Sequence, residues 1–390
     1  MKTHIVFALF WLLNVNSSFA WQNQTPFDTG EIPFEMVKKT IVIPVQIKGT
    51  TYKFILDTGG VLMLSKELQQ AHQFQVYDEI TVLDINKNKR NFQRVTIDKI
   101  SIGNATFTEQ QAIVSFDNKT YPGKCFGTDG MIGRNFFKGK LLQIDYKRKV
   151  LRLTEDETLF KLNKKYHAPL KISNRGLPEV LMQIDGKKQY IEFDSGSGDF
   201  FSYKTKDAKR LSGKSGNEKL QFKGIFSFGV SKQNVKSTTR YRIKIDSLQL
   251  GKTWFANFYS DFSKPSAPRI GAGILYKGKL TIDYKNLGFY FEPYDVKSNQ
   301  KSCNTFGFSI ASVNNDYIIK WVLKGSPAEK AGLLYGMKII SINNQPVSKI
   351  PDDCNFYING YPFETAEEVK LSYKDQKNRL KSITLRKLYF

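Results

Sequence analysis

Short apolar runs bounded by turn residues recur along the chain, and they predict a mainly β protein. Residues 43–47 and 180–184 are two such runs, and each is followed by a tight turn at a glycine. A second run then begins, at residues 52–56 and again at residues 190–193. An apolar run of this length is typical of a strand buried on both faces. We therefore expect a β-hairpin at each of the two places.

Both hairpins end in the same three kinds of residue: an acid, a hydroxyl residue and a glycine. These residues are Asp57, Thr58 and Gly59 in the first copy, and Asp194, Ser195 and Gly196 in the second. A carboxylate at the end of a buried strand costs on the order of several kcal/mol unless its oxygens are hydrogen-bonded or its charge is shared. The hydroxyl can donate such a bond, and the glycine lets the backbone turn closely under the acid. One copy alone is typical of an ordinary turn, whereas two copies indicate a paired site.

Two such turns facing each other would place the carboxyls of Asp57 and Asp194 against one water molecule. Like charges at that range cannot both ionise, so the pair would hold one proton near neutral pH or below. One acid then activates the water while the other protonates a carbonyl group. The sequence leaves open which acid takes which part, because the two titrate as a coupled pair. The motifs have the outline of an aspartic peptidase site.

The repetition extends well beyond the acids. Each copy carries Ile-Asp-Tyr-Lys near its end, with the Asp 88 residues after the first acid and 89 residues after the second. An apolar pair followed by glycine precedes that marker, within residues 130–137 and 269–275. This element would let one strand pass beneath the acid-bearing loop, although glycine also favours a plain strand-to-helix turn. The repeat predicts two homologous lobes, at about residues 30–160 and 165–295.

The two lobes resemble those of the pepsin and retropepsin clan of aspartic peptidases. That clan carries Asp-Thr/Ser-Gly in each half, followed by an apolar-apolar-Gly element, and residues 131–135 are close to the retropepsin form of that element. The resemblance implies antiparallel β lobes, a cleft between them, and a catalytic dyad of Asp57 and Asp194. It also implies that a hydroxyl residue braces each acid and that a glycine shapes each loop. The residues in these supporting roles are Thr58, Gly59, Ser195 and Gly196.

Two departures from the clan leave substrate preference and pH optimum open. Gly60 follows the first motif where the clan usually has alanine or serine. The expected first flap, residues 83–92, contains no tyrosine, although a hairpin around residues 86–88 can still close over a substrate as retropepsin flaps do. The counterpart in the second lobe is expected within residues 224–241, where Gly229 and several serines and threonines indicate mobility.

The last part of the chain has a pattern of its own. Residues 297–301 are all polar, which is typical of a linker. The pattern after them predicts strands and a short capped helix. The helix segment at residues 325–333 and the strand after it resemble those of a PDZ domain, here spanning residues 303–390. The resemblance implies an α+β domain whose loop amides capture a peptide C-terminus, with the peptide added as an extra strand. The loop residues are Phe306, Gly307, Phe308 and Ser309. The alternative is a domain that serves only as a rigid appendage.

The 390 residues carry a formal net charge of +23, spread as single lysines and short groups. Without a basic helix or an aromatic-spaced basic tract, the charge indicates a solvated surface suited to an anionic cell envelope rather than to nucleic acid. Residues 1–20 have the pattern of a signal peptide: Lys2, an apolar stretch too short to span a bilayer, and a small-residue cleavage site. No cysteine follows directly, so a lipid anchor is unsupported. We expect an exported protein: periplasmic, cell-envelope or secreted.

The cysteines and histidines narrow the chemistry further. Cys125, Cys303 and Cys354 lack metal-ligand spacing, and their odd number leaves at least one unpaired. Cys303 and Cys354 fall in one predicted domain and can pair in an oxidising compartment, whereas Cys125 is expected to be a buried thiol. Beyond the leader only His72 and His167 are present, which disfavours zinc and Ser/His/Asp hydrolases. No metal or cofactor is implied.

These patterns together predict an exported aspartic endopeptidase that cleaves polypeptides and recruits them through its PDZ-like domain. The alternative from another class is a non-catalytic peptide-binding envelope protein on the same scaffold. The presence of both acids and both loop glycines disfavours that alternative, and the leader disfavours a basic nucleic-acid binder. The natural substrate, the cleavage specificity and the oligomeric state cannot be predicted from these patterns.

Overall fold

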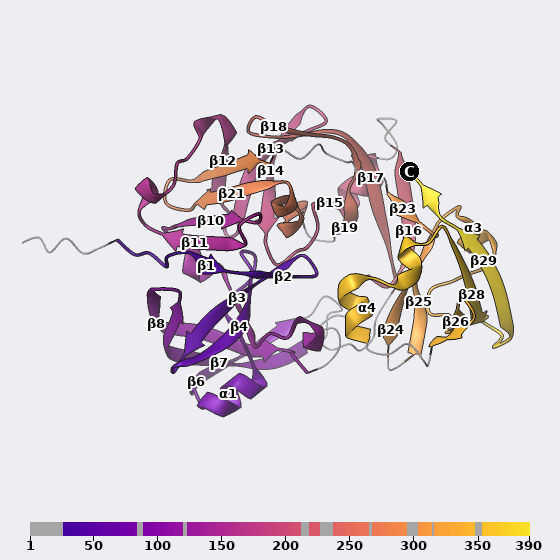
Figure 1. Ribbon diagram of the computed structural model, residues 1–390, viewed down its shortest axis with the longest axis horizontal. Coiled ribbons are helices and arrows are strands. Elements are labelled where there is room, and N and C mark those ends of the chain that lie inside the picture. The colour runs from indigo at the N-terminus through magenta and orange to yellow at the C-terminus, as the bar shows by residue number, and fades with distance from the viewer. Residues whose placement is uncertain are drawn as a thin grey trace, which may run out of the picture.

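The computed structural model describes residues 26–83, 89–119, 123–211, 218–226, 237–264, 267–294, 303–313, 316–347 and 353–390. The expected leader, the expected flap tip at residues 86–88 and the expected linker lie outside the described residues. Strands dominate the described chain, so the prediction of a mainly β fold is confirmed. No helix within these ranges is long and apolar enough to cross a membrane. Two β lobes lie one above the other in Figure 1, and the C-terminal part lies beside them.

The first lobe is built on an 8-stranded sheet in the order β2-β3-β4-β9-β5-β8-β7-β6. The β3–β4 hairpin turns at Lys48 and Gly49, whose φ angles of 48° and 81° are those of a two-residue hairpin turn. The elements of this lobe are β1 (Ile32–Pro33), β2 (Glu35–Val37), β3 (Thr40–Ile47), β4 (Thr50–Leu56), β5 (Met63–Ser65), α1 (Lys66–His72), β6 (Gln75–Leu83), β7 (Lys89–Ile102), β8 (Ala105–Phe116), η1 (Gly123–Phe126), β9 (Gly130–Ile132), η2 (Arg134–Phe137), β10 (Leu141–Asp145) and β11 (Val150–Thr154).

The second lobe repeats the order of elements of the first. Its β13–β14 hairpin turns at Asp185 and Gly186, with φ angles of 45° and 81°. The strand–helix unit β5–α1 recurs as β15–α2, and β9–η2 recurs as β20–η5. Two short helices, η3 (Glu157–Leu159) and η4 (Lys164–Tyr166), connect the first lobe to the second. The elements of the second lobe are β12 (His167–Ile172), β13 (Pro178–Ile184), β14 (Lys187–Asp194), β15 (Phe201–Lys204), α2 (Thr205–Leu211), β16 (Lys219–Gly224), β17 (Thr238–Leu250), β18 (Thr253–Tyr259), β19 (Asp261–Lys264), β20 (Arg269–Gly271), η5 (Ala272–Tyr276), β21 (Gly278–Asp283) and β22 (Gly288–Pro293).

A shared sheet joins the two lobes, with the strands β1-β11-β10-β21-β22-β12 side by side. Its central pair is antiparallel β10–β21, in which Leu142 lies opposite Ile282. Both side chains are buried, and one cluster of apolar side chains runs from this sheet into both lobes. The two strands that lead into the repeated Ile-Asp-Tyr-Lys segments, β10 and β21, therefore hold one lobe against the other.

The C-terminal part is an α+β domain with its own apolar core, as predicted. A 4-stranded sheet within this domain has the order β27-β26-β28-β29. The first and last strands of the domain, β23 and β30, pair with each other. Its elements are β23 (Asn304–Thr305), β24 (Phe308–Val313), β25 (Asp316–Leu323), α3 (Pro327–Lys330), β26 (Ile339–Ile342), β27 (Gln345–Pro346), α4 (Asp353–Asn359), η7 (Pro362–Thr365), β28 (Glu368–Lys374), β29 (Leu380–Arg386) and β30 (Leu388–Tyr389).

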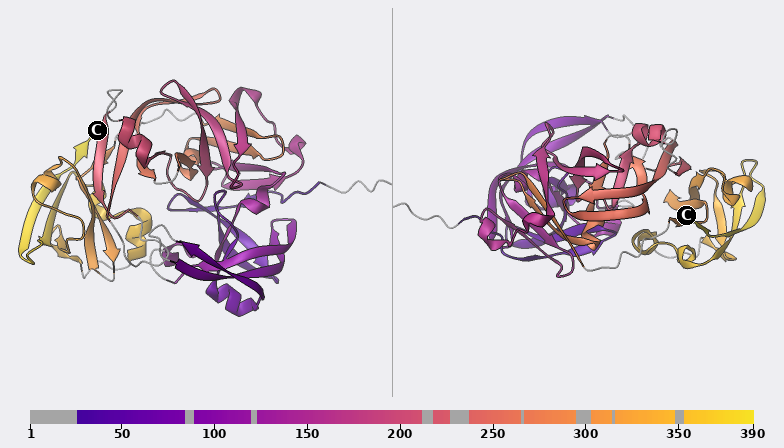
Figure 2. Two further views of the ribbon diagram at one scale, coloured as in Figure 1. Left: turned by 180° about the vertical axis from the view of Figure 1, so that it is seen from behind. Right: turned by 90° about the horizontal axis from the view of Figure 1, so that it is seen from above.

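This domain shares a sheet with the second lobe. Strand β16 pairs antiparallel with β25, so that Phe222 lies opposite Leu323. Phe222 is 1% exposed, and its ring lies 4.9 Å from the rings of both Phe262 and Trp321. The described residues of the expected second flap, on β16 and β17, therefore belong to an inter-domain sheet. Figure 2 shows from two further directions that the domain stays to one side of both lobes.

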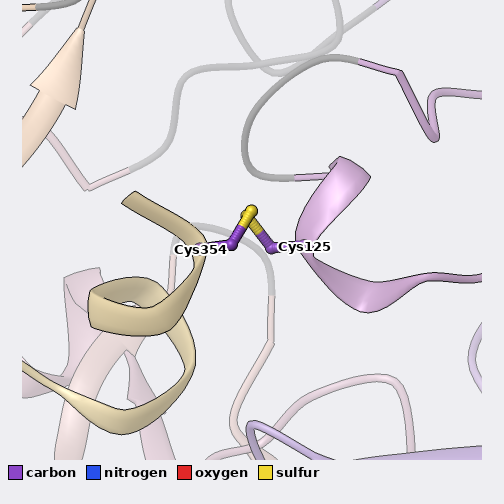
Figure 3. Close-up of a disulfide and its surroundings, with 2 residues drawn as sticks. All are labelled: Cys125 and Cys354. Atoms are coloured by element: carbon purple, nitrogen blue, oxygen red, sulfur yellow. A yellow bond between two sulfur atoms is a disulfide. The ribbon is translucent and has the colours of Figure 1, made fainter. Parts of the chain in front are cut away.

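A disulfide ties the same domain to the first lobe. It joins Cys125 of η1 to Cys354 of α4, with Cα atoms 4.9 Å apart (Figure 3). The expected pairing of Cys303 with Cys354 is therefore wrong, and so is the expectation that Cys125 is a free thiol. Cys303 is the buried free cysteine, and its Sγ accepts a hydrogen bond from Arg242. No local pattern in the sequence indicates this pairing, because η1 meets α4 only when the domains are docked.

Candidate active site

Asp57 and Asp194 lie at equivalent ends of equivalent strands. Asp57 directly follows β4, and Asp194 is the last residue of β14. In each lobe a short strand runs parallel beside the acid-bearing strand: β9 beside β4 and β20 beside β14. The amide of Asp57 donates to the carbonyl of Ile132 at 2.9 Å, so the apolar-apolar-Gly element fixes the start of the acid loop. The expected passage of one strand beneath this loop is what the structure shows.

The hydroxyl residues after the acids bind the two loops to each other. Thr58 N–H donates to Ser195 Oγ at 2.9 Å, and Ser195 N–H donates to Thr58 Oγ1 at 3.0 Å. The hydroxyls then donate across the lobe boundary, from Ser195 to the Leu56 carbonyl at 2.8 Å and from Thr58 to the Phe193 carbonyl at 3.4 Å. Thr58 and Ser195 are both 0% exposed, so a lost bond would leave a buried polar group unpaired. The structure thus places both hydroxyls between the lobes rather than on the carboxylates.

The glycines are the residues that contact the carboxylates. Gly59 N–H donates to Asp57 Oδ1 at 2.8 Å, and Gly196 N–H donates to Asp194 Oδ1 at 2.9 Å. Each glycine also lies against the acid of the other lobe. A Cβ atom would lie 2.9 Å from Asp194 Cγ if added at Gly59, and 2.4 Å from Asp57 Cγ if added at Gly196. The structure therefore brings the two acids, the two hydroxyl residues and the two glycines into one site.

The two acids share a hydrogen bond, and the surroundings of Asp57 disfavour its ionised form. Burial, then the charge of Asp194, then the hydrogen bond between the acids raise the pKa of Asp57 to about 7. The Gly59 amide and the Arg269 guanidinium lower the pKa of Asp57, but by less. The pair therefore holds a proton at pH values below about 7.

A charged network, which sequence reasoning missed, extends from the second acid. Arg269 Nη1 lies 2.7 Å from Asp194 Oδ2, and its Nη2 lies 2.6 Å from Glu192 Oε1. The other Glu192 oxygen lies 3.1 Å from Nη2 of Arg175. Two signals were present in the sequence: Glu192 interrupts an apolar run, and Arg269 opens an element in which the first copy has Met131. Without the strand register, nothing tied these charges to the acid.

The loop predicted to bind a peptide C-terminus leads directly into β24. Phe306 and Phe308 are buried in the core of the C-terminal domain, and Phe308 and Ser309 already belong to β24. Gly307 has a left-handed φ of 82°, and its amide donates to Thr305 Oγ1 at 3.0 Å. Within the described chain β24 pairs with β25 alone, so its other edge has no strand partner there. Carboxylate capture by this loop stays a prediction.

Comparison with known families assigns the two parts of the chain. Residues 43–136 match the family model of aspartyl proteases, and residues 295–356 match that of the PDZ domain. This chain carries an aspartyl protease domain and a PDZ domain. The aspartyl protease match includes Asp57, whereas Asp194 lies outside both matches and is tied to the site by the geometry above. The predicted resemblance is confirmed at the level of family and fold.

Two solved structures align with much of this chain. The aspartic proteinase from Irpex lacteus aligns with 12% identity and a TM-score of 0.43, covering 70% of this chain and 99% of its own. Basic 7S globulin from soybean aligns with 10% identity and a TM-score of 0.43, covering 69% of this chain and 95% of its own. No curated protein has a matching sequence.

Proposed function

We propose that the chain is an aspartic endopeptidase in which Asp57 and Asp194 hydrolyse a peptide bond through one activated water. The observation that carries the proposal is the hydrogen bond shared by two acids from two lobes, within loops that Thr58 and Ser195 bind together. A singly protonated pair offers one base and one acid at the same place, as general acid–base catalysis requires. Polypeptides are the substrate class.

The chemistry proceeds in two balanced steps. In the first, the ionised carboxyl takes a proton from water as the water oxygen bonds to the peptide carbonyl carbon. The protonated carboxyl gives its proton to the carbonyl oxygen, which leaves a gem-diol and no covalent enzyme intermediate. In the second, the peptide nitrogen takes the proton gained from water, the C–N bond breaks, and a gem-diol hydroxyl returns a proton to the other acid. The pair is then singly protonated again.

We assign polypeptide recruitment to the PDZ domain. The unpartnered edge of β24 within the described chain supports the addition of a peptide strand there, with its C-terminus at the Phe306–Ser309 loop. The domain is held to the second lobe by the β16–β25 pairing and to the first lobe by the disulfide. A polypeptide bound on β24 is therefore kept at a fixed position relative to the two acids.

We also infer that the protein is exported to the periplasm, the cell envelope or the outside. The signal-peptide pattern of residues 1–20 and the Cys125–Cys354 disulfide support this, because disulfides persist in oxidising compartments. The net charge of +23 favours an anionic envelope surface as its surroundings. Nucleic acid is not among the proposed partners.

The proposed function is tested by digestion of a peptide library with the purified protein at acid to neutral pH. A matched preparation of the Asp57→Asn/Asp194→Asn double variant controls for contaminating proteases. Internal cleavage by the wild type alone supports the proposal, and the cleavage sites give the specificity. Equal cleavage by both preparations, or none by either, contradicts it.

Gly196→Ala should lower peptide cleavage by at least about 100-fold, since displacing a reacting group by about 1 Å costs that much. The new Cβ would lie 2.4 Å from Asp57 Cγ, so the acid has to move away from its partner. Gly198→Ala is the matched control, because its Cβ would approach Lys39 Cβ at 3.0 Å and the Lys38 carbonyl oxygen at 3.3 Å rather than a carboxyl of either acid. Cleavage rates and thermal unfolding of both variants check this. A Gly196→Ala variant that cleaves at the wild-type rate would show that the acids tolerate separation.

A further inference from the structure

The two lobes differ in charge at one pair of equivalent positions beside the acids. In the first lobe Ile55 on β4 lies opposite Met131 on β9. In the second lobe Glu192 on β14 lies opposite Arg269 on β20. Ile55 and Glu192 each precede the acid by two residues, so they share its face of the strand. One acid therefore has an apolar pair beside it, and the other has a charged pair.

Two contacts hold Arg269 against the second acid. Its Nη1 lies 2.7 Å from Asp194 Oδ2, and its Nη2 lies 2.6 Å from Glu192 Oε1. Glu192 is also bound by Arg175 at 3.1 Å, and its side chain is only 2% exposed. The Arg269 side chain is 22% exposed. If Arg269 turned away, the buried carboxylate of Glu192 would keep only Arg175 of these two partners, which is costly in free energy.

The first acid has a methyl group in the place of this guanidinium. A Cβ atom added at Gly60 would lie 2.7 Å from the Met131 methyl carbon and 2.8 Å from Asp57 Oδ2, so both surround the same small space. Arg134 lies next to this loop, but its guanidinium donates to the Gly60 carbonyl at 3.2 Å. The cation is therefore placed on Asp194 and not on Asp57.

We propose that Arg269 decides where the single proton of the pair resides: on Asp57, which leaves Asp194 as the ionised acid that activates the water. A guanidinium in contact with a carboxyl stabilises its ionised form, whereas a methyl group does not. This assignment rests on the proposed function for its chemical meaning. Asp194 takes the proton from water and Asp57 donates to the carbonyl oxygen. Arg269 is a positioning residue, since it acts through Asp194.

The other charges around the pair are consistent with a proton on Asp57 and a negative charge on Asp194. Within the described residues, Asp57 across the lobe boundary and Arg269 from β20 both contact Asp194. Behind Arg269 lie Glu192 from β14 and Arg175 from the segment between β12 and β13. Arg269 and Arg175 share Glu192, so the three groups together carry one net positive charge, and Arg269 is the member that contacts Asp194.

The first test compares pH–rate profiles of peptide cleavage. Arg269→Met gives the second lobe the residue that the first lobe has at this position. Without the cation, the doubly protonated, inactive pair forms at higher pH. The acidic limb of the pH–rate profile should therefore move to higher pH by about one unit or more. Arg269→Lys keeps the charge and should keep the limb close to that of the wild type. Met131→Leu is the control at the equivalent uncharged position and should leave the limb where it is.

The second test does not need activity. In protein labelled with 13C at its aspartate carboxyls, the Asp57→Asn and Asp194→Asn variants identify the signals of the two acids by their loss. At a pH of about 5, the wild type should show a protonated carboxyl at Asp57 and a carboxylate at Asp194. In Arg269→Met the two signals should move toward each other, because the proton is then shared.

A wild-type spectrum with the proton on Asp194 overturns the proposal. So does a folded Arg269→Met variant with an unmoved acidic limb and unmoved carboxyl signals. If Arg269→Met fails to fold, the wild-type spectrum and the Arg269→Lys profile decide the question. A wild type that cleaves no peptide contradicts the proposed function, whereas the carboxyl spectra still test where the proton resides.

Discussion

Asp57→Asn and Asp194→Asn should each lower the rate of peptide cleavage by about 10²–10⁴-fold, the range of general acid–base contributions. An amide can neither accept a proton from water nor release one to a carbonyl oxygen, so either change removes half of the proton transfer. The two acids share one hydrogen bond and act as a unit. The double variant should therefore be little slower than the slower single variant. Values of kcat/KM for one library-derived peptide measure all three.

The acid variants should keep the fold, because the buried bonds between Thr58 and Ser195 do not involve the carboxyls. Asp283→Asn is the matched control: Asp283 is also buried, but it accepts hydrogen bonds from Lys285 and Asn286, away from the site. We expect this control to keep its cleavage rate even where its thermal stability falls. A single dyad variant that retains a tenth or more of the wild-type rate while folded would contradict the roles given to the two acids.

Much of the site could be predicted because its parts are local in sequence and appear twice. Asp57 and Asp194 each close an apolar strand, and a carboxylate there needs nearby hydrogen-bond donors. The second copy then identified the partner. The same locality explains the hairpin turns at Gly49 and Gly186, where a left-handed φ is required.

What could not be predicted depends on register and docking. Arg269 reaches Asp194 because β20 lies parallel to β14 with Glu192 opposite Arg269, and no local pattern specifies that pairing. The direction of the Thr58 hydroxyl, across the lobe boundary to Phe193, likewise depends on how the lobes meet.

Reduction of the Cys125–Cys354 disulfide should loosen the contact between η1 and α4 and lower the free energy of opening it by about 2–4 kcal/mol. The two cysteines are 229 residues apart, so the bond removes much freedom from the separated state. The described contacts at this place include two at the ring of Tyr357. Lys38 Nζ lies 3.2 Å from the Tyr357 ring centroid, and the Phe126 ring lies 5.9 Å from it. Hydrogen exchange of α4 amides, with and without dithiothreitol, measures the change.

The loosening should be confined to one side of the PDZ domain. Strand β25 stays paired with β16, and Phe222 stays between its aromatic neighbours, so amides of β25 should keep their protection. Cys125→Ser/Cys354→Ser should match the reduced wild type and be insensitive to dithiothreitol, whereas Cys303→Ser should still respond to it, since Cys303 is the free thiol. Unchanged exchange at α4 after reduction would mean that the remaining contacts hold the domain by themselves. Because the acid loops are bound to each other independently of this bond, cleavage of short peptides should persist after reduction.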